Sequence, residues 1–156
     1  MPGSPKSPPR QPSAPPTVGW REWVALPALG IGRIKAKMDT GARSSALHAY
    51  DIRYVRRGGR RIVKFRVHPI QKDDRSFVEA EGEWVEDRRV RSSSGTETVR
   101  PVIRTMLELG GERWPMELTL TRRDAMGFRL LLGRQALKGR CLVDPGKSFL
   151  TGKGRA

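Results

Sequence analysis

Cysteine is nearly absent from this sequence of 156 residues, which contains only Cys141. A single cysteine excludes an internal disulfide, and disulfide scaffolds belong to oxidising compartments. The first residues lack the apolar core of a secretory signal, and no apolar run approaches the roughly 18 residues of a membrane-spanning helix. We therefore expect a cytoplasmic protein that makes no membrane contact.

Acidic residues are also scarce: 16 Asp and Glu stand against 31 Lys and Arg, so the formal net charge is +15. A large positive charge favours anionic partners without specifying them, and acidic peptides, nucleic acid and a ribosome surface all stay open. The densest group of cations, which would suit phosphates, consists of Arg53, Arg56, Arg57, Arg60 and Arg61. An arginine-rich surface with no partner is the third interpretation.

Apolar residues are almost missing from the first 17 positions, where prolines stand among Ser, Lys and Arg. Such a composition cannot bury enough surface to fold, so residues 1–17 are predicted to be a disordered tail rich in Pro and Ser. Residues 18–150 are long enough for one domain with a single core. Residues 151–156 are predicted to be a short disordered C-terminal tail.

Long helical periodicity is absent as well, and the domain consists of short apolar and β-branched runs separated by glycine. Strands are predicted at 19–26, 32–38, 47–57, 61–67, 77–86, 99–109 and 116–120. The glycine pairs at 58–59 and 110–111 predict hairpin turns, because glycine accepts a positive φ without steric cost. The leucines at 130–132 predict a buried strand, and residues 133–137 predict one short helix.

What the sequence does contain is Asp39-Thr40-Gly41, placed where the alternating strand at 32–38 ends. The tripeptide alone is a weak signal, since an Asp-Thr-Gly turn without chemistry explains it locally. Further along the chain, the segment Leu-Leu-Gly-Arg at 131–134 ends the buried run. Two matched segments in this order are much harder to obtain by chance than one.

These segments resemble the retropepsin-like aspartic peptidases, in which a strand delivers Asp-Thr-Gly-Ala to the active site and an apolar-apolar-Gly-Arg segment packs beneath it. Residues 37–49, 100–103 and 131–134 are similar to a bacterial family that bears the name ATP-dependent zinc protease and often accompanies RimK-like glutamate ligases. The resemblance covers residues 18–150. It implies an all-β fold, a closed β-barrel or sandwich of the acid-protease type with one short C-terminal helix.

The resemblance also implies which residues form the site. The catalytic segment is expected to be Asp39, Thr40 and Gly41. The residues expected to contact substrate are Ala42, Arg43, Ser44, Ser94 and Gly95. Structural support is expected from Gly133 and Arg134. A mobile hairpin should cover the substrate, with 91–100 as the preferred candidate, its tip at 92–96, and the hairpin at 58–59 as the second.

Peptide hydrolysis without a covalent intermediate needs one carboxylate to deprotonate water and one carboxylic acid to protonate the substrate. Two carboxyls about 3 Å apart cannot both ionise easily, so they share a proton. Because the chain has one Asp-Thr-Gly, the resemblance implies that a second Asp39 comes from a two-fold related subunit of a homodimer. Gly41 is expected to permit a tight turn, and the Thr40 hydroxyl to bond a nearby backbone group.

One position departs from the pattern of the viral retropepsins. They commonly carry an acidic residue two positions after the glycine, where it pairs with the arginine of the Gly-Arg segment. Here that position is Arg43, so the usual ion pair cannot form. Arg134 then needs another acceptor, for which a backbone carbonyl and Asp144 are the two candidates.

Zinc ligands are scarce, although a catalytic zinc normally has three protein ligands. The available nitrogen and sulfur ligands, His48, His68 and Cys141, are scattered along the chain. No Gly-rich loop ending in Lys-Ser or Lys-Thr precedes a helix either. We therefore expect no metal and no cofactor, and ATP use would belong to a partner such as a RimK-like ligase.

Other polar residues have plain interpretations beside the chemical ones. The stripe of Glu79, Glu81 and Glu83 lies on one face of a predicted strand and could hold a cation, but pairing with arginine is favoured. His48 is predicted to be a packing or surface residue. Ser44 and Ser45 lack the His-Asp pair that a serine nucleophile requires.

Two functional hypotheses follow. The first is an aspartic peptidase-like hydrolase that acts on acidic or glutamate-modified protein segments. The second is a noncatalytic retropepsin-fold module whose basic surface docks RNA, a ribosome or a glutamate ligase, since a fold does not guarantee its activity.

Overall fold

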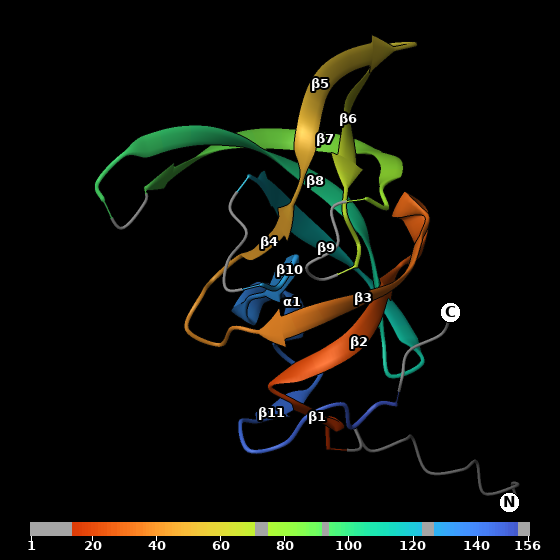
Figure 1. Cartoon of the computed structure of the whole chain (residues 1–156), viewed down its shortest axis with the longest axis vertical. Helices are drawn as coiled ribbons and strands as arrows, with labels where there is room; N and C mark the ends of the chain where they lie inside the picture. The colour runs from red at the N-terminus through yellow and green to blue at the C-terminus, as the bar shows by residue number, and fades with distance from the viewer. Residues whose placement is uncertain (1–13, 71–74, 92–93, 123–126, 153–156) are drawn as a thin grey trace, which may run out of the picture.

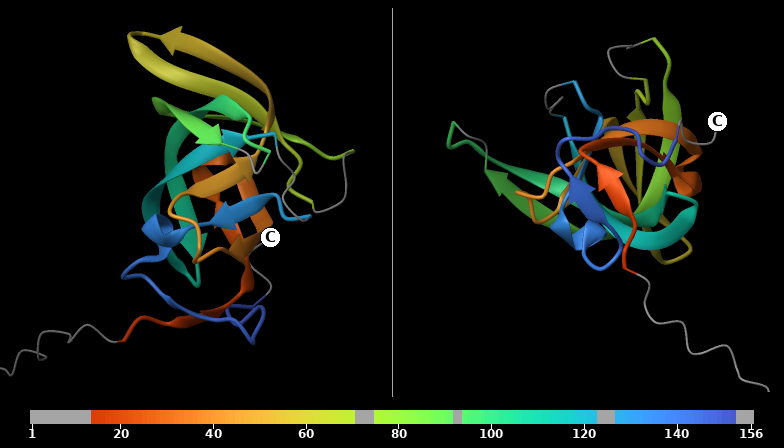
Figure 2. Two further views of the ribbon diagram at one scale, coloured as in Figure 1. Left: turned by 90° about the vertical axis from the view of Figure 1, so that its left-hand side faces the viewer. Right: turned by 90° about the horizontal axis from the view of Figure 1, so that it is seen from below.

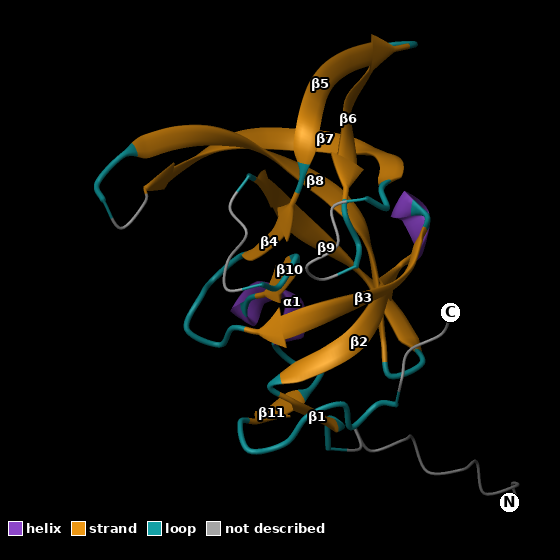
Figure 3. Cartoon of the chain, in the orientation of Figure 1, coloured by secondary structure: helices purple, strands orange, loops and turns teal. Residues whose placement is uncertain are grey.

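The computed structural model describes residues 14–70, 75–91, 94–122 and 127–152, and strands dominate this part of the chain (Figures 1 and 3). The strands are β1 (Thr17–Gly19), β2 (Arg21–Leu26), β3 (Ile31–Met38), β4 (Ser45–His48), β5 (Tyr50–Arg57), β6 (Arg60–Val67), β7 (Val78–Arg91), β8 (Glu97–Leu109), β9 (Glu112–Thr121), β10 (Leu130–Leu132) and β11 (Leu142–Asp144). Helical structure in these ranges is limited to α1 (Arg134–Leu137) and a 3₁₀ turn (Pro27–Leu29). Neither has the length or apolar character to cross a membrane. The predicted all-β fold with one short C-terminal helix is confirmed.

The main sheet has nine strands in the order β2-β3-β10-β4-β9-β8-β7-β6-β5. An additional pairing of β2 with β8, at Ala25 and Glu108, joins the first strand of this order back to the sixth and closes a ring. Side chains alternate between the two faces of a strand, so one face of each ring strand supplies the core. Core residues with no exposed surface include Ile34, Leu47, Ile103, Leu118 and Leu130.

Both predicted hairpin turns are confirmed. Strands β5 and β6 flank the glycines at 58–59, and strands β8 and β9 flank those at 110–111. All four glycines have a positive φ, between 57° and 84°, which a residue with a β-carbon rarely adopts. The β5–β6 and β7–β8 hairpins both extend beyond the closed part of the sheet (Figures 1 and 2).

The prediction of one continuous strand at 47–57 is wrong, because the strand is interrupted at Ala49, between β4 and β5. Strand β4 pairs with β9 and β10, whereas β5 pairs with β6 at the edge of the sheet. Ala49 is fully buried, and its N–H donates to the carbonyl of Thr121 at 2.8 Å. The strand predicted at 19–26 is likewise divided, by a bend at Trp20 between β1 and β2.

The two ends of the described chain meet beside β2. Strands β1 and β11 form a separate two-stranded parallel sheet. The carboxylate of Glu22 is fully buried and accepts hydrogen bonds from the N–H of Gly19 at 2.6 Å, of Leu150 at 2.8 Å and of Thr151 at 3.1 Å. The Thr151 hydroxyl donates a fourth bond at 2.8 Å. These bonds offset the cost of burying a charge and clasp the C-terminal segment to β2.

Candidate active site

Asp39 directly follows β3, as the sequence predicts. Its N–H donates to the carbonyl of Leu132 at 2.8 Å, which extends the parallel pairing of β3 with β10 by one residue. The side chain is half-buried, and within the described residues no hydrogen bond or ion pair engages its carboxylate. The backbone of Asp39 is therefore fixed while its carboxylate stays available.

A tight turn follows Asp39, closed by the N–H of Ala42 donating to the Asp39 carbonyl at 3.1 Å. The tight turn expected at Gly41 is present, although Gly41 is not among the described glycines with a positive φ and an added β-carbon would meet only Asp39 Oδ1 at 3.5 Å. The Thr40 hydroxyl makes no hydrogen bond among the described residues, so the expected hydroxyl-to-backbone bond is wrong. Thr40 acts through its carbonyl instead, which accepts a bond from Arg134.

The start of α1 holds the loop at 39–44 from beneath. The N–H groups of Arg134 and Gln135 donate to the carbonyls of Ala42 and Arg43, at 2.8 and 3.0 Å. The N–H of Gly133 donates to Ser45 Oγ at 3.0 Å. The backbone N–H groups of three successive residues, 133–135, thus hold the loop in position.

Arg134 makes a further bond from its side chain. Its Nη1 donates to the Thr40 carbonyl at 3.0 Å, which confirms a backbone carbonyl as the acceptor. The alternative acceptor, Asp144, uses its Oδ1 to bind the N–H of Gly146 at 2.9 Å. A guanidinium held by the loop backbone does not need the carboxylate that Arg43 replaces.

Gly133 is required by space and not by backbone conformation. Its φ of −92° is open to any residue. An added β-carbon, however, would clash with the carbonyl of Ser44 and lie 2.9 Å from the carbonyl oxygen of Ala42. Only glycine lets α1 approach the loop this closely.

A groove of about 690 Å³ opens beside the loop, which we call the α1 groove. Its lining residues are Thr40, Arg43, Arg134, Gln135, Leu137, Lys138, Cys141, Leu142 and Val143. The lining contains three cations and no carboxylate. Leu142 of β11 is 55% exposed there. Burial raises the pKa of the Cys141 thiol, and the charge of Glu22 raises it further, so the thiol stays neutral and is a weak metal ligand.

The residues predicted to contact substrate fall into two groups. Ala42, Arg43 and Ser44 lie on the loop next to Asp39, and exposed Arg43 has no carboxylate partner among the described residues. Ser94 and Gly95 lie at the end of the β7–β8 hairpin, which the sequence predicts to cover the substrate (Figure 1). The rest of that predicted tip, at 92–93, lies outside the described residues.

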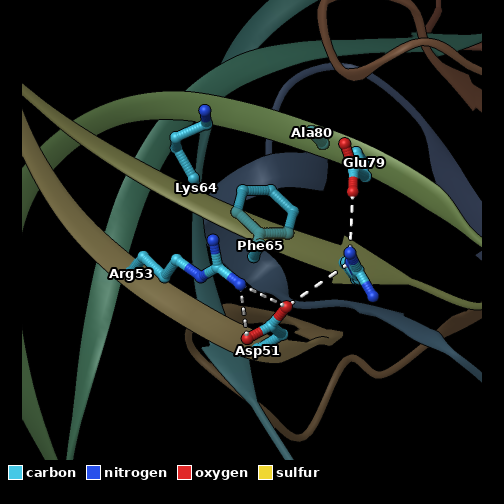
Figure 4. A pocket seen from close by; sticks show the side chains of 7 residues that line it. Asp51, Arg53, Lys64, Phe65, Glu79 and Ala80 are labelled. Atoms are coloured by element: carbon cyan, nitrogen blue, oxygen red, sulfur yellow. Dashed lines mark hydrogen bonds and ion pairs between the residues drawn. The ribbon is translucent and has the colours of Figure 1, made fainter.

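The glutamate stripe on β7 pairs with arginines, as favoured from the sequence. Glu79 contacts Arg66 at 2.9 Å (Figure 4). Glu81 contacts Arg57 at 2.9 Å, and Glu83 contacts Arg104 at 3.9 Å. The carboxylates are thus neutralised by the protein itself, and the shallow pocket of about 70 Å³ at this place is lined by charges of both signs.

The three scattered zinc-ligand candidates have other contacts. His48 Nδ1 lies 3.2 Å from Nη1 of buried Arg129, a residue that sequence reasoning missed because a lone arginine carries no pattern. The ring of His68 stacks on Tyr50 at 4.6 Å, and Cys141 lines the α1 groove. Within the described ranges no three His, Cys, Asp or Glu side chains are close enough to hold a metal ion.

Comparison with known proteins finds one matching family model and a similar solved structure. A family model described as the retropepsin-like aspartic endopeptidase RimB matches residues 17–154. A crystal structure of the Legionella pneumophila protein Lpg0085, of unknown function, superposes with a TM-score of 0.72 at 29% identity and covers 87% of this chain and 98% of that one.

Curated relatives are larger proteins. A probable alpha-L-glutamate ligase of Shewanella pealeana is 46% identical over 136 residues, and one of Parasynechococcus marenigrum is 50% identical over 135 residues. These matches cover 87% and 86% of this chain. The chain spans only 30% and 29% of the length of those relatives. A segment like this one is therefore joined, in each of them, to a much longer remainder.

Proposed function

Because the chain belongs to the RimB-like family of retropepsin-like aspartic endopeptidases, we propose that it is a peptidase-like hydrolase in which the Asp39 carboxylates of two subunits activate water. The observation that carries this proposal is the state of Asp39. Its backbone is fixed at the end of β3, and its carboxylate has no partner among the described residues of its own subunit. A reactive carboxylate needs this combination of a rigid position and an open side chain.

In the proposed reaction one Asp39 carboxylate accepts a proton from water as the water oxygen attacks the peptide carbonyl carbon. The protonated Asp39 of the other subunit donates its proton to the carbonyl oxygen, giving a neutral tetrahedral intermediate. The C–N bond then breaks as one carboxyl gives its proton to the leaving nitrogen and the other carboxylate takes a hydroxyl proton of the intermediate, which releases an amine and a carboxylic acid. Thr40 and Gly41 hold the turn that presents the carboxylate, and Arg134 positions that turn through the Thr40 carbonyl.

The α1 groove is the surface we assign to the second copy of the chain. It adjoins the Asp39 loop, contains the exposed side chain of Leu142, and borders an edge of the β1–β11 sheet that pairs with no other strand in the described part of the chain. An open strand edge beside exposed apolar side chains such as Leu142 is suited to strand addition by an identical chain. Symmetry at this place would bring two copies of the same loop together.

Replacing Leu142 with aspartate should therefore convert a dimer into a monomer and remove peptide cleavage, because a charge enters an apolar contact. Sedimentation velocity would measure the mass, and circular dichroism would check the fold. Ile70→Asp is the matched control, since Ile70 is 52% exposed and lies outside the groove. A Leu142→Asp variant that is still dimeric would remove this surface from the proposal.

The substrate we propose is a protein segment extended with glutamate. The relatives named as glutamate ligases support this choice, since a ligase that adds glutamate makes an acidic product. The unpaired cation of Arg43 on the Asp39 loop and the net charge of +15 support it electrostatically. The same names lead us to propose a RimK-like ligase as a partner.

A peptide with a glutamate tail should be cleaved with a kcat/KM about tenfold or more above that of the same peptide with a glutamine tail, because acidic substrates are attracted by the basic site. Mass spectrometry of the products measures both the rate and the cleaved bond. The preference should weaken with added salt, which screens it. Equal cleavage of the two peptides would contradict acidic specificity without contradicting hydrolysis.

A second candidate function is a noncatalytic module that recognises glutamate-extended segments for a ligase. It is favoured by the names of the curated relatives, which describe a ligase and no peptidase. In that case peptide binding would be measurable by calorimetry while no product formed. Substitution of Asp39 separates the two candidates.

A further inference from the structure

The β5–β6 hairpin carries a concentration of positive charge, and we call its residues 53–64 the basic arm. Its cations are Arg53, Arg56, Arg57, Arg60, Arg61 and Lys64, and the segment contains no carboxylate. The strand register sets like charges directly opposite each other in three pairs: Arg53 with Lys64, Arg56 with Arg61, and Arg57 with Arg60. Directly opposed like charges destabilise a hairpin, so this arrangement is unfavourable without an anion.

The protein neutralises only part of this charge. Arg53 pairs with Asp51 at 3.2 Å, and Arg57 pairs with Glu81 at 2.9 Å. Arg56, Arg60 and Lys64 have no ion pair among the described residues. The basic arm therefore retains unmatched cations along its length.

The tip of the basic arm is exposed. Strand β6 pairs with β7 only from Ile62 to Val67, so among the described residues no further strand pairs with the residues nearer the turn (Figure 1). Of these residues, Arg57 and Arg61 reach β7 with their side chains, at Glu81 and Trp84. Because side chains alternate, the pair of Arg56 and Arg61 lies on one face and the pair of Arg57 and Arg60 on the other. Two rows of guanidinium groups thus point in opposite directions from one ribbon.

Aromatic residues at the base of the basic arm argue against stacking on single-stranded bases. Arg61 lies over the ring of Trp84 at 4.0 Å, and the ring of Tyr54 lies 4.6 Å from that of Trp84. The indole is thus already in contact with a guanidinium and a second ring. The hairpin also contains no Asn or Gln, the side chains that read adenine. These features favour contact with phosphates over stacking on bases.

We propose that the basic arm binds the phosphate backbone of duplex DNA, independently of the Asp39 site. The major groove of B-form DNA is about 12 Å wide and admits a two-stranded β-ribbon, whereas that of an A-form RNA duplex is deep and narrow. A two-stranded ribbon with cations on both faces can therefore contact both phosphate rows of the DNA groove at once. Binding through phosphates neutralises the opposed arginine pairs and releases the counterions of the DNA.

Fluorescence anisotropy of the full chain with a duplex DNA of about 20 base pairs tests this proposal. Arg56→Gln/Arg60→Gln removes one unpaired cation from each face of the basic arm. The slope of log K against log salt should fall by about two, and affinity at moderate salt should fall about tenfold. Cleavage of the glutamine-tailed peptide, which does not depend on charge attraction, should not change, and this separates the proposal from the proposed peptidase activity.

Arg33→Gln/Lys147→Gln is the matched control, because it removes the same charge from exposed positions outside the basic arm. It should leave the salt slope near that of the unmodified chain. Equal losses in both double variants would overturn the proposal, since the effect would then reflect net charge. Displacement of the DNA by a polyglutamate peptide, single-stranded DNA or duplex RNA at equal charge concentration would overturn it as well.

Discussion

Replacing Asp39 with asparagine should lower peptide cleavage by about 10² to 10⁴-fold, the usual contribution of a positioned acid or base. Asparagine has nearly the same shape but cannot accept the proton of the attacking water or supply one to the carbonyl oxygen. In the proposed dimer the change removes both carboxyls, so no acid–base pair is left. Cleavage of a glutamate-tailed peptide, followed by mass spectrometry, measures the loss.

The Asp39→Asn variant should fold normally, because within the described residues the carboxylate takes no part in a hydrogen bond or ion pair. Asp87→Asn is a matched control: Asp87 is exposed, and its Oδ1 accepts a bond from Trp84 at 3.1 Å that an amide oxygen can also accept. Unchanged cleavage by Asp39→Asn would remove Asp39 from the mechanism. Peptide binding with no cleavage by the unmodified chain would support the noncatalytic module.

Gly133→Ala should damage both the stability and the activity of the protein. The new methyl group would meet backbone carbonyls of Ser44 and Ala42, which cannot rotate away as a side chain can. Overpacking of this kind costs about 1–3 kcal/mol of unfolding free energy. Displacement of the loop by about 1 Å should lower cleavage by a further 10²-fold. Urea unfolding and the peptide assay measure the two effects.

Gly146→Ala provides the control for removing a glycine, since its β-carbon would meet only the Asp144 side chain at 3.4 Å. Its unfolding midpoint should stay close to that of the unmodified chain. A Gly133→Ala variant with full stability and full activity would show that α1 and the loop at 39–44 can separate without consequence. The hydrogen bonds from Arg134 and Gln135 to that loop would then have no functional role.

Local patterns in the sequence were sufficient where neighbouring residues determine the structure. The glycine pairs predict both hairpins because a tight turn depends on the backbone freedom of those residues alone. The alternation of apolar and basic residues in 32–38 is also a local signal, and it predicts a strand that ends at Asp39. Because Arg43 stands where an acidic partner is expected, the sequence predicted that Arg134 would bind another acceptor. The Thr40 carbonyl is that acceptor.

Contacts between distant segments could not be predicted in this way. Ala49 interrupts an apparently continuous strand because β4 and β5 have different neighbours, which the local pattern does not record. The buried role of Glu22 depends on groups at Leu150 and Thr151, and nothing around it in the sequence indicates burial. From the sequence, the glycine needed for the site was assigned to Gly41. The position where a β-carbon would clash is Gly133, and the backbone that it would meet belongs to Ala42 and Ser44, about ninety residues earlier in the chain.

The clasp at Glu22 has a consequence for how this fold can be joined to other polypeptides. Gly19 and Thr151 bind the same carboxylate, so the chain enters and leaves the domain at one corner. Fused sequence on either side would depart from that corner without breaking a strand pairing, as in domains that tolerate insertion and circular permutation. The glutamate-ligase relatives, in which a similar segment is about 30% of the length, are compatible with such modular use.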